Sequence, residues 1–241
     1  MALSDTEEKA LGSHFPFDIV ALVASAGGLE ALSTVLRPLP ADFPAAIIIV
    51  QHLPASSSQL VDILERRSAL PVQWAEHDAL IEPSKVTVCP PRQILVLHPD
   101  RTGALEPNEG GILEYPIDAF LRSLADSYGK RALVVVLTGM GNDGAAGAKA
   151  LKIAGGTVIA QSADTAEYAS MPNAAIATGA VDLVVPLYEI ASVLIRVVAQ
   201  GGRFQNRVMK KKRSKSCSPG QGKCAPSCGR SIGLTPALVL S

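Results

Sequence analysis

Aromatic residues and long apolar runs are scarce in this chain. Aromatic side chains make up 4% of its 241 residues. No apolar run approaches the roughly 20 residues that a membrane-spanning helix needs. The first nine residues are polar and acidic, which does not fit a secretory signal. These absences exclude a membrane-inserted or exported protein, and we expect a cytoplasmic one.

Acidic residues are missing from the end of the chain. No Asp or Glu occurs from Phe204 to Ser241, whereas nine of the 22 Lys and Arg residues lie at or after Arg203. The preceding 202 residues hold the other 13 basic residues and all 22 acidic ones, a net charge of −9. A body this acidic argues against nucleic acid as its ligand.

Cysteine is also rare, with four residues in all. Cys89 lies in an apolar run and is predicted to be a buried thiol. The other three, Cys217, Cys224 and Cys228, lie in the basic tail with no tail histidine beside them. Three such residues make an incomplete zinc set, so we expect no metal and no cofactor.

Apolar runs and helical patterns alternate along the rest of the chain. The runs predict strands at 18–24, 45–51, 72–74, 131–137, 157–160 and 182–185. The helical patterns cover 29–36, 56–67, 116–124, 145–153, 173–178 and 187–198. Continuously apolar strands between helices indicate an α/β fold: one doubly wound, mostly parallel sheet with helices on both faces.

The region from 79 to 115 differs from this pattern. Its short apolar runs at 86–89, 94–97 and 112–115 are broken by proline and glycine and predict a small inserted β-hairpin region. We therefore expect a flexible leader over 1–17, a catalytic domain over 18–200 and a basic, disordered tail over 201–241.

Three polar residues follow predicted strands of the sheet, two of them directly and the third after a glycine-rich turn. They are Ser25, His52 and Asp143. The carboxyl ends of parallel strands meet at one edge, where such proteins place their chemistry. A histidine can take the proton of a serine hydroxyl, and a carboxylate can orient and stabilise that histidine. The spacing therefore favours a Ser-His-Asp triad.

Glycine-rich turns surround these residues. Gly27 lies in the tight turn after Ser25, and the backbone N–H groups of Ala26 and Gly27 lie at a helix start, where they can donate to a developing oxyanion. The segment Val134-Val-Val-Leu-Thr-Gly-Met-Gly-Asn-Asp-Gly-Ala145 is a buried strand that stops at a second such turn. Its free N–H groups can supply another donor.

Simpler roles remain open for each residue. Ser25 and Asp143 can be helix caps, and His52 can be a satisfied polar group at a strand end. A catalytically inactive binding module is therefore one alternative.

A nucleotide-binding, Rossmann-like oxidoreductase is the other alternative. Gly139, Gly141 and Gly144 form the dinucleotide fingerprint, and Asp164 lies where a ribose-binding acid is expected. Against this, Asp143 would place a carboxylate where the pyrophosphate should bind.

Five blocks together resemble the catalytic domain of the CheB family, the bacterial chemotaxis protein-glutamate methylesterases. In order they are Val23-Ala-Ser-Ala-Gly-Gly-Leu-Glu-Ala-Leu32, Val50-Gln-His-Leu-Pro54, Pro116-Ile-Asp-Ala-Phe120, Leu137-Thr-Gly-Met-Gly-Asn-Asp-Gly-Ala145 and Met171-Pro-Asn-Ala-Ala175. The resemblance runs from about Asp18 to Val198.

The resemblance implies a serine hydrolase that demethylates glutamate methyl esters on chemoreceptor cytoplasmic helices, and often deamidates glutamines as well. It makes Ser25 the nucleophile, His52 the general base and Asp143 the orienting acid. It also assigns an oxyanion-binding N–H to Met140. No cofactor, metal or nucleic acid is implied.

Several positions depart from the family pattern. Val23 stands where glycine is usual and is expected to crowd the turn before Ser25, Ala26 replaces a frequent threonine, and Ile94 replaces a frequent histidine. Typical members also carry an N-terminal receiver domain, which residues 1–17 are too short to form. We therefore expect a catalytic domain that escapes such control, is regulated by a separate receiver or methyltransferase protein, or is part of a larger system.

Overall fold

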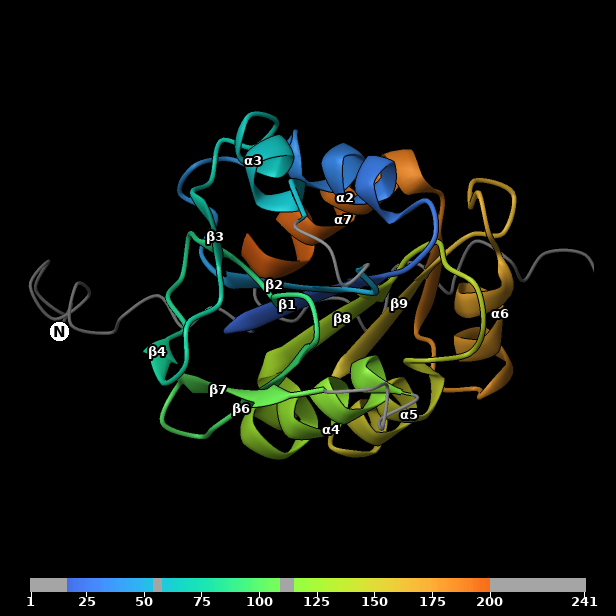
Figure 1. Cartoon of the computed structure of the whole chain (residues 1–241). Helices are drawn as coiled ribbons and strands as arrows, with labels where there is room; N and C mark the ends of the chain where they lie inside the picture. The colour runs from blue at the N-terminus through green and yellow to red at the C-terminus, as the bar shows by residue number, and fades with distance from the viewer. Residues whose placement is uncertain (1–16, 54–57, 109–114, 200–241) are drawn as a thin grey trace, which may run out of the picture. The chain divides into compact units, whose positions relative to one another are not determined.

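The central feature is a seven-stranded sheet in which neighbouring strands are parallel (Figure 1). The computed structural model describes residues 17–53, 58–108 and 115–199. The strand order is β10-β9-β8-β1-β2-β5-β3. These strands are β1 (Ile19–Ala24), β2 (Ala46–Gln51), β3 (Val72–Trp74), β5 (Val86–Val88), β8 (Ala132–Val136), β9 (Thr157–Gln161) and β10 (Leu183–Val185).

Helices cover both faces of the sheet, as the alternating pattern predicted. Helices α2 (Gly28–Leu36), α3 (Leu60–Glu65) and α7 (Leu187–Ala199) lie on one face. Helices α4 (Pro116–Tyr128), α5 (Ala145–Ile153) and α6 (Ser170–Ala177) pack on the other. A short 3₁₀ turn, η2 (Gly129–Arg131), joins α4 to β8.

Each strand supplies both apolar layers, because successive side chains point to opposite faces. In β1, Val20 and Leu22 pack with α2 and α7, whereas Ala21 and Val23 pack with α4 and α5. All four are fully buried. A strand buried on both sides must be apolar throughout, which explains the unbroken runs in the sequence.

The predicted hairpin region contains a three-stranded antiparallel sheet in the order β4-β7-β6. Its strands are β4 (Ala79–Leu80), β6 (Gln93–Leu97) and β7 (Thr102–Pro107). The assignment of 86–89 to this hairpin is wrong, because β5 pairs between β2 and β3 in the main sheet. The strand β7 was not predicted. Of the run expected at 112–115, residues 112–114 lie outside the described residues.

Two helix boundaries also differ from expectation. Helix α3 begins at Leu60, whose N–H donates to Ser58 Oγ at 3.2 Å, and residues 56 and 57 of the longer predicted helix are not among those described. Helix α6 begins at Ser170, three residues early, since Ser170 Oγ and the Met171 N–H both bond to the Gly139 carbonyl. Tertiary contacts set this start.

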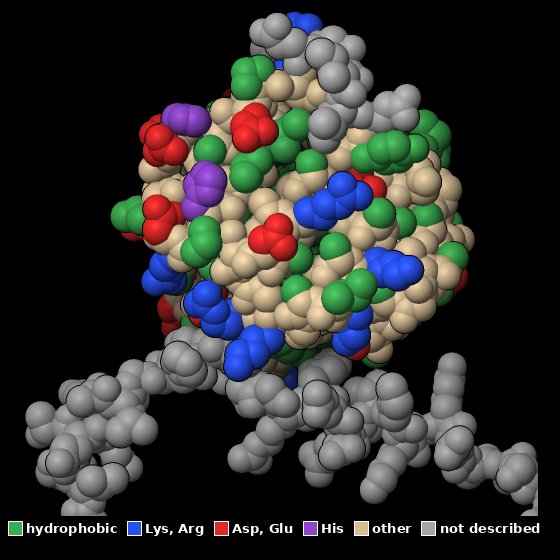
Figure 2. Space-filling view, turned by 90° about the horizontal axis from the view of Figure 1, so that it is seen from below, with side chains coloured by type: hydrophobic (Ala, Val, Ile, Leu, Met, Phe, Trp, Pro, Cys, Tyr) green, Lys and Arg blue, Asp and Glu red, His purple; other side chains and the backbone are tan. Residues whose placement is uncertain are grey.

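The predicted leader and tail lie almost wholly outside the described residues. Of residues 1–17, only Phe17 is described, and it is buried in the core. In the part of the chain that is described, no helix is both long and apolar enough to cross a membrane. Figure 2 shows the outer side of the α4–α5 layer, where basic and acidic side chains are interspersed with small hydrophobic groups.

Candidate active site

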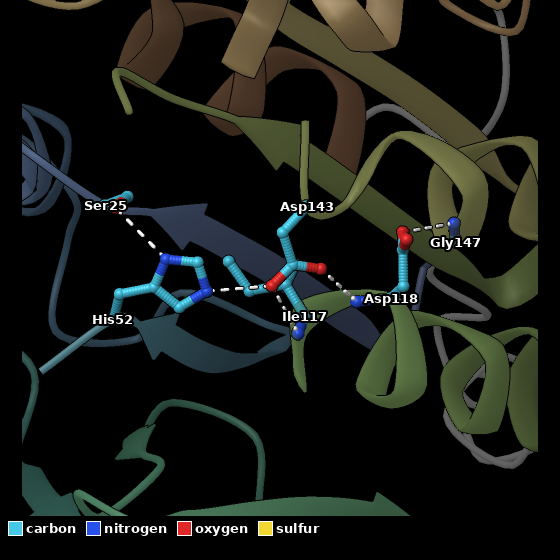
Figure 3. A network of polar contacts seen from close by, with 6 residues as sticks. All are labelled: Ser25, His52, Ile117, Asp118, Asp143 and Gly147. Carbon is cyan, nitrogen blue, oxygen red and sulfur yellow. Dashed lines mark hydrogen bonds and ion pairs between the residues drawn. The ribbon is translucent and has the colours of Figure 1, made fainter. Parts of the chain in front are cut away.

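The three predicted catalytic residues meet at one edge of the sheet. Strand β1 pairs with β2 on one side and β8 on the other, so the chain reverses its direction of winding here. This is the switch point where α/β folds bind ligands. Ser25 Oγ lies 3.1 Å from His52 Nδ1, and His52 Nε2 lies 2.8 Å from Asp143 Oδ2 (Figure 3).

The partners of His52 assign its tautomer. An ionised carboxylate only accepts hydrogen bonds, so Asp143 requires the proton to be on Nε2. Nδ1 then carries the lone pair and accepts the Ser25 hydroxyl proton. This arrangement exchanges the two nitrogens relative to the serine-protease template, in which Nε2 faces the serine. The His52 side chain is 35% exposed, so a substrate can reach it, whereas that of Asp143 is 5% exposed.

Asp143 is held by the start of a helix distant in sequence. Its Oδ2 accepts the Ile117 N–H at 3.0 Å, and its Oδ1 accepts the Asp118 N–H at 2.9 Å. These two donors belong to the first turn of α4, whose N-terminus favours a negative charge. The contacts of Asp143 are compatible with both hypotheses for this residue, a helix cap and a member of a triad. The helix that it caps is α4, however, and not α5, which follows Asp143 in the sequence.

Asp118 is a supporting residue that the sequence did not single out. Its Oδ1 accepts the Gly147 N–H at 2.6 Å and so joins α4 to α5. A Cβ on Gly147 would lie 2.6 Å from Leu121 Cβ, so the two helices need glycine to approach this closely. Burial raises the pKa of the Asp118 carboxyl, and the Asp143 carboxylate adds to the rise, while the Gly147 N–H opposes it.

The turn after β1 presents Ser25 to the cleft. The Ser25 N–H donates to the Thr138 carbonyl at 3.0 Å, and the Gly28 N–H donates to the Ser25 carbonyl at 3.0 Å. Gly27 adopts φ 75°, and a Cβ there would lie 2.7 Å from Glu167 Oε2. The positive φ favours glycine at this position, whereas the Glu167 carboxylate ends a flexible side chain that can move aside.

Gly139 brings the second glycine turn against Ser25. A Cβ on Gly139 would lie 2.9 Å from Ser25 Cβ and 2.5 Å from Met171 Sδ. The following residue, Met140, is exposed at this edge. Within the described part of the chain, no acceptor is recorded for the N–H groups of Ala26, Gly27 or Met140. All three amides are free to donate to a bound group.

The cleft over Ser25 has a volume of about 560 Å³. Its lining combines the Ala26–Gly28 turn with Gln51 and His52, and adds two carboxylates, Glu30 and Glu167. Arg67 pairs with Glu30 at 3.0 Å. Among residues 17–53, 58–108 and 115–199, no group of three His, Cys, Asp or Glu side chains is placed to hold a metal ion.

The dinucleotide alternative finds little support in this geometry. Gly139 packs on Ser25, and a Cβ on Gly144 would lie 3.0 Å from Ile117, so both glycines serve internal packing. Asp143, which would repel a pyrophosphate, is turned to His52. Asp164 is exposed in the β9–α6 connection and does not line the cleft over Ser25.

The departures at Val23 and Ile94 are accommodated in the core. Val23 lies opposite Val50 and Val136 in the sheet and is fully buried, and its side chain packs against the α4–α5 layer. The expected crowding of the turn is not seen, since Ser25 keeps its hydrogen bonds to Thr138 and His52. Ile94 is buried in β6.

Comparison with known proteins agrees with these motifs. The family model described as CheB methylesterase matches residues 20–194. A protein-glutamate methylesterase/protein-glutamine glutaminase of Moorella thermoacetica is 39% identical over 191 residues, covering 77% of this chain and 45% of that protein. One from Burkholderia orbicola is 41% identical over 194 residues, covering 77% and 55%.

A solved structure is similar as well. The CheB methylesterase catalytic domain of Thermotoga maritima superposes with a TM-score of 0.70 at 33% identity, covering 76% of this chain and 99% of that domain. The chain spans about half the length of the two full-length relatives above.

Proposed function

The chain belongs to the CheB methylesterase family, and we propose that its described domain is a serine hydrolase acting on glutamate methyl esters of chemoreceptor-type proteins. Glutamine side chains, which differ from the ester only in the leaving group, would be a second substrate. The continuous chain of hydrogen bonds Ser25–His52–Asp143 supports this proposal most directly.

In the first half of the reaction, Ser25 Oγ attacks the ester carbonyl carbon while His52 Nδ1 takes the hydroxyl proton. Asp143 stabilises the charged imidazole that forms. The negative charge on the former carbonyl oxygen is met by the free N–H groups of Ala26, Gly27 and Met140. The intermediate collapses, Nδ1 returns its proton to the departing oxygen, and methanol leaves. Ammonia leaves instead when the substrate is glutamine.

In the second half, water replaces the leaving group. His52 Nδ1 takes a proton from water, whose oxygen attacks the acyl-serine carbonyl. Collapse releases glutamate and returns the proton to Ser25 Oγ. The buried Asp143 keeps the same tautomer of His52 through both halves, because its oxygens remain tied to the N-terminus of α4.

The test is methanol release from a methyl-esterified receptor fragment by the purified chain. Ser25→Ala removes the attacking oxygen, so kcat should fall by about 10³-fold or more. Ser192→Ala, which changes an exposed serine on α7, serves as the matched control and should retain wild-type activity.

Covalent labelling separates an enzyme from an inactive binding module. A fluorophosphonate should label wild-type protein and the Ser192→Ala variant, but not Ser25→Ala. Equal methanol release by wild type and Ser25→Ala would overturn the proposed role of Ser25. A wild-type chain that binds the methylated receptor fragment and releases no methanol would identify a binding module.

A further inference from the structure

A second hollow lies on the other side of His52 from the serine cleft. It has a volume of about 330 Å³ and shares only Gln51 and His52 with that cleft. Its remaining wall includes Cys89, Arg92 and Pro116. Gln51 Oε1 is buried, with no hydrogen-bond partner among the described residues, which leaves an acceptor between the two hollows. A substrate segment lying over His52 would contact both.

Arg92, an exposed residue, lines this hollow in an unfavourable backbone conformation. It has φ 60°, a left-handed value that glycine and asparagine adopt far more readily than arginine. The conformation is held because the Arg92 carbonyl accepts the Asn108 N–H at 2.8 Å. Residues in such sparsely populated conformations cluster at active sites and ligand clamps, where the surrounding structure holds them.

The Arg92 guanidinium forms no ion pair with any of the described residues. Arg67 pairs with Glu30 and Arg131 with Asp18, but within the described ranges Arg92 has no acidic partner. It is also the one Lys or Arg among the residues that line the two hollows, whereas the serine cleft holds Glu30 and Glu167. The site is therefore polarised, with carboxylates on the Ser25 side of His52 and a guanidinium on the other.

We propose that Arg92 is a specificity residue that binds a carboxylate side chain of the substrate segment close to the esterified glutamate. This inference rests on the proposed esterase function. A guanidinium binds a carboxylate through paired N–H donors, which gives both charge and direction. Glu167 has no basic partner among the described residues, and it disfavours the same carboxylate in the serine cleft, so the segment binds in one direction.

The test uses helical peptides that carry one glutamate γ-methyl ester. Each member of the set has a single glutamate at one of the four positions before or after the ester, and its partner peptide has glutamine there. Initial rates of methanol release are compared, and mass spectrometry checks that this glutamine has not been deamidated. For at least one position, wild-type kcat/KM should be about fivefold higher with glutamate, the range of a partly exposed ion pair. The difference should lie in KM, and salt should reduce it.

The variants remove the charge without endangering the fold. Arg92→Gly and Arg92→Asn suit φ 60°, so neither should lower the melting temperature. Both should lose the preference for glutamate and still hydrolyse the glutamine peptides. Arg92→Lys should keep part of the preference, and Arg92→Glu should reverse it. Arg37→Gly, at an exposed arginine that lines neither hollow, is the charge-matched control and should leave the preference intact.

The outcomes separate the two proposals. If wild type hydrolyses both members of every pair equally, the role of Arg92 is wrong while the esterase proposal stands. The same holds if Arg92→Gly retains the full glutamate preference. If wild type hydrolyses no ester at all, the esterase proposal fails and the role of Arg92 falls with it.

Discussion

Replacing Asp143 tests the hydrogen-bond assignment at His52. In Asp143→Asn, one oxygen becomes an NH₂ group. The remaining oxygen can occupy the Oδ2 position, where it accepts two donors, the Ile117 N–H and His52 Nε2–H. The NH₂ group then faces only the Asp118 N–H. This orientation leaves the Asp118 N–H unpaired, whereas the opposite orientation leaves the Ile117 N–H unpaired and needs the His52 proton on Nδ1. We expect the first orientation, in which the tautomer of His52 survives.

The expected losses follow from this orientation. The neutral amide no longer stabilises the charged imidazole, so kcat should fall by about 10²–10³-fold, or about 2.7–4 kcal/mol. Asp143→Ala also frees the tautomer and should lose about 10⁴-fold, as when the tautomer is lost in the serine-protease triad. The free energy of unfolding should fall by about 1–2 kcal/mol in the Asn variant, because one buried N–H is left unpaired.

The assay is methanol release at saturating ester, with urea unfolding of the same preparations. Asp126→Asn, which neutralises an exposed carboxylate on α4, is the control and should match wild type in both. If the Asn and Ala variants have the same kcat, the assigned tautomer is wrong. If either variant keeps more than about a tenth of wild-type kcat, Asp143 does not act in the reaction.

Three other expectations concern buried groups. The raised pKa of Asp118 means that its contribution to stability is full below the usual Asp pKa and lost as pH rises through the raised value. Asp118→Asn should therefore gain stability relative to wild type between pH 4 and pH 7 in urea titrations, and a growing deficit would contradict this. Burial raises the pKa of the Cys89 thiol to about 12, so at pH 8 it should react with iodoacetamide at least about 100-fold more slowly than a free cysteine. Mass spectrometry of a variant with serine at the three tail cysteines measures this, and labelling at the rate of free cysteine would refute it. Gly139→Ala places a carbon 2.9 Å from Ser25 Cβ, so it should cost about 1–3 kcal/mol of stability and about 10²-fold in kcat. Gly141→Ala, whose Cβ meets nothing within 4 Å, measures the cost of positive φ alone, and equal activity of these two variants would contradict the packing argument.

The sheet was predictable because a strand buried on both faces must be apolar at successive positions, a pattern visible in the sequence itself. The predicted strands at 18–24 and 131–137 each begin with one charged residue and are apolar without interruption after it, and both form central strands, β1 and β8. Helix α5 begins and ends where predicted, at Ala145 and Ile153, since glycine precedes it and a glycine pair follows. These signals depend only on neighbouring residues.

The errors lie where pairing partners are distant in sequence. The run at 86–89 looked like part of the hairpin because prolines and glycines follow it, yet β5 fills a place between β2 and β3. Strand β7, with its Gly103 and Pro107, carries little apolar signal of its own. It forms through antiparallel pairing with β4 and β6.

For the site, the sequence alone determined which residues stand at the strand ends: Ser25, His52 and Asp143 each follow an apolar run, and local pattern is enough to find them. Only the tertiary structure decided how they meet, because the order of strands in the sheet and the approach of α4 are long-range properties. It placed Nδ1 of His52 toward Ser25, and it tied Asp143 to the start of α4. It also set Arg92 in a hollow beside His52, a position that no local pattern indicates.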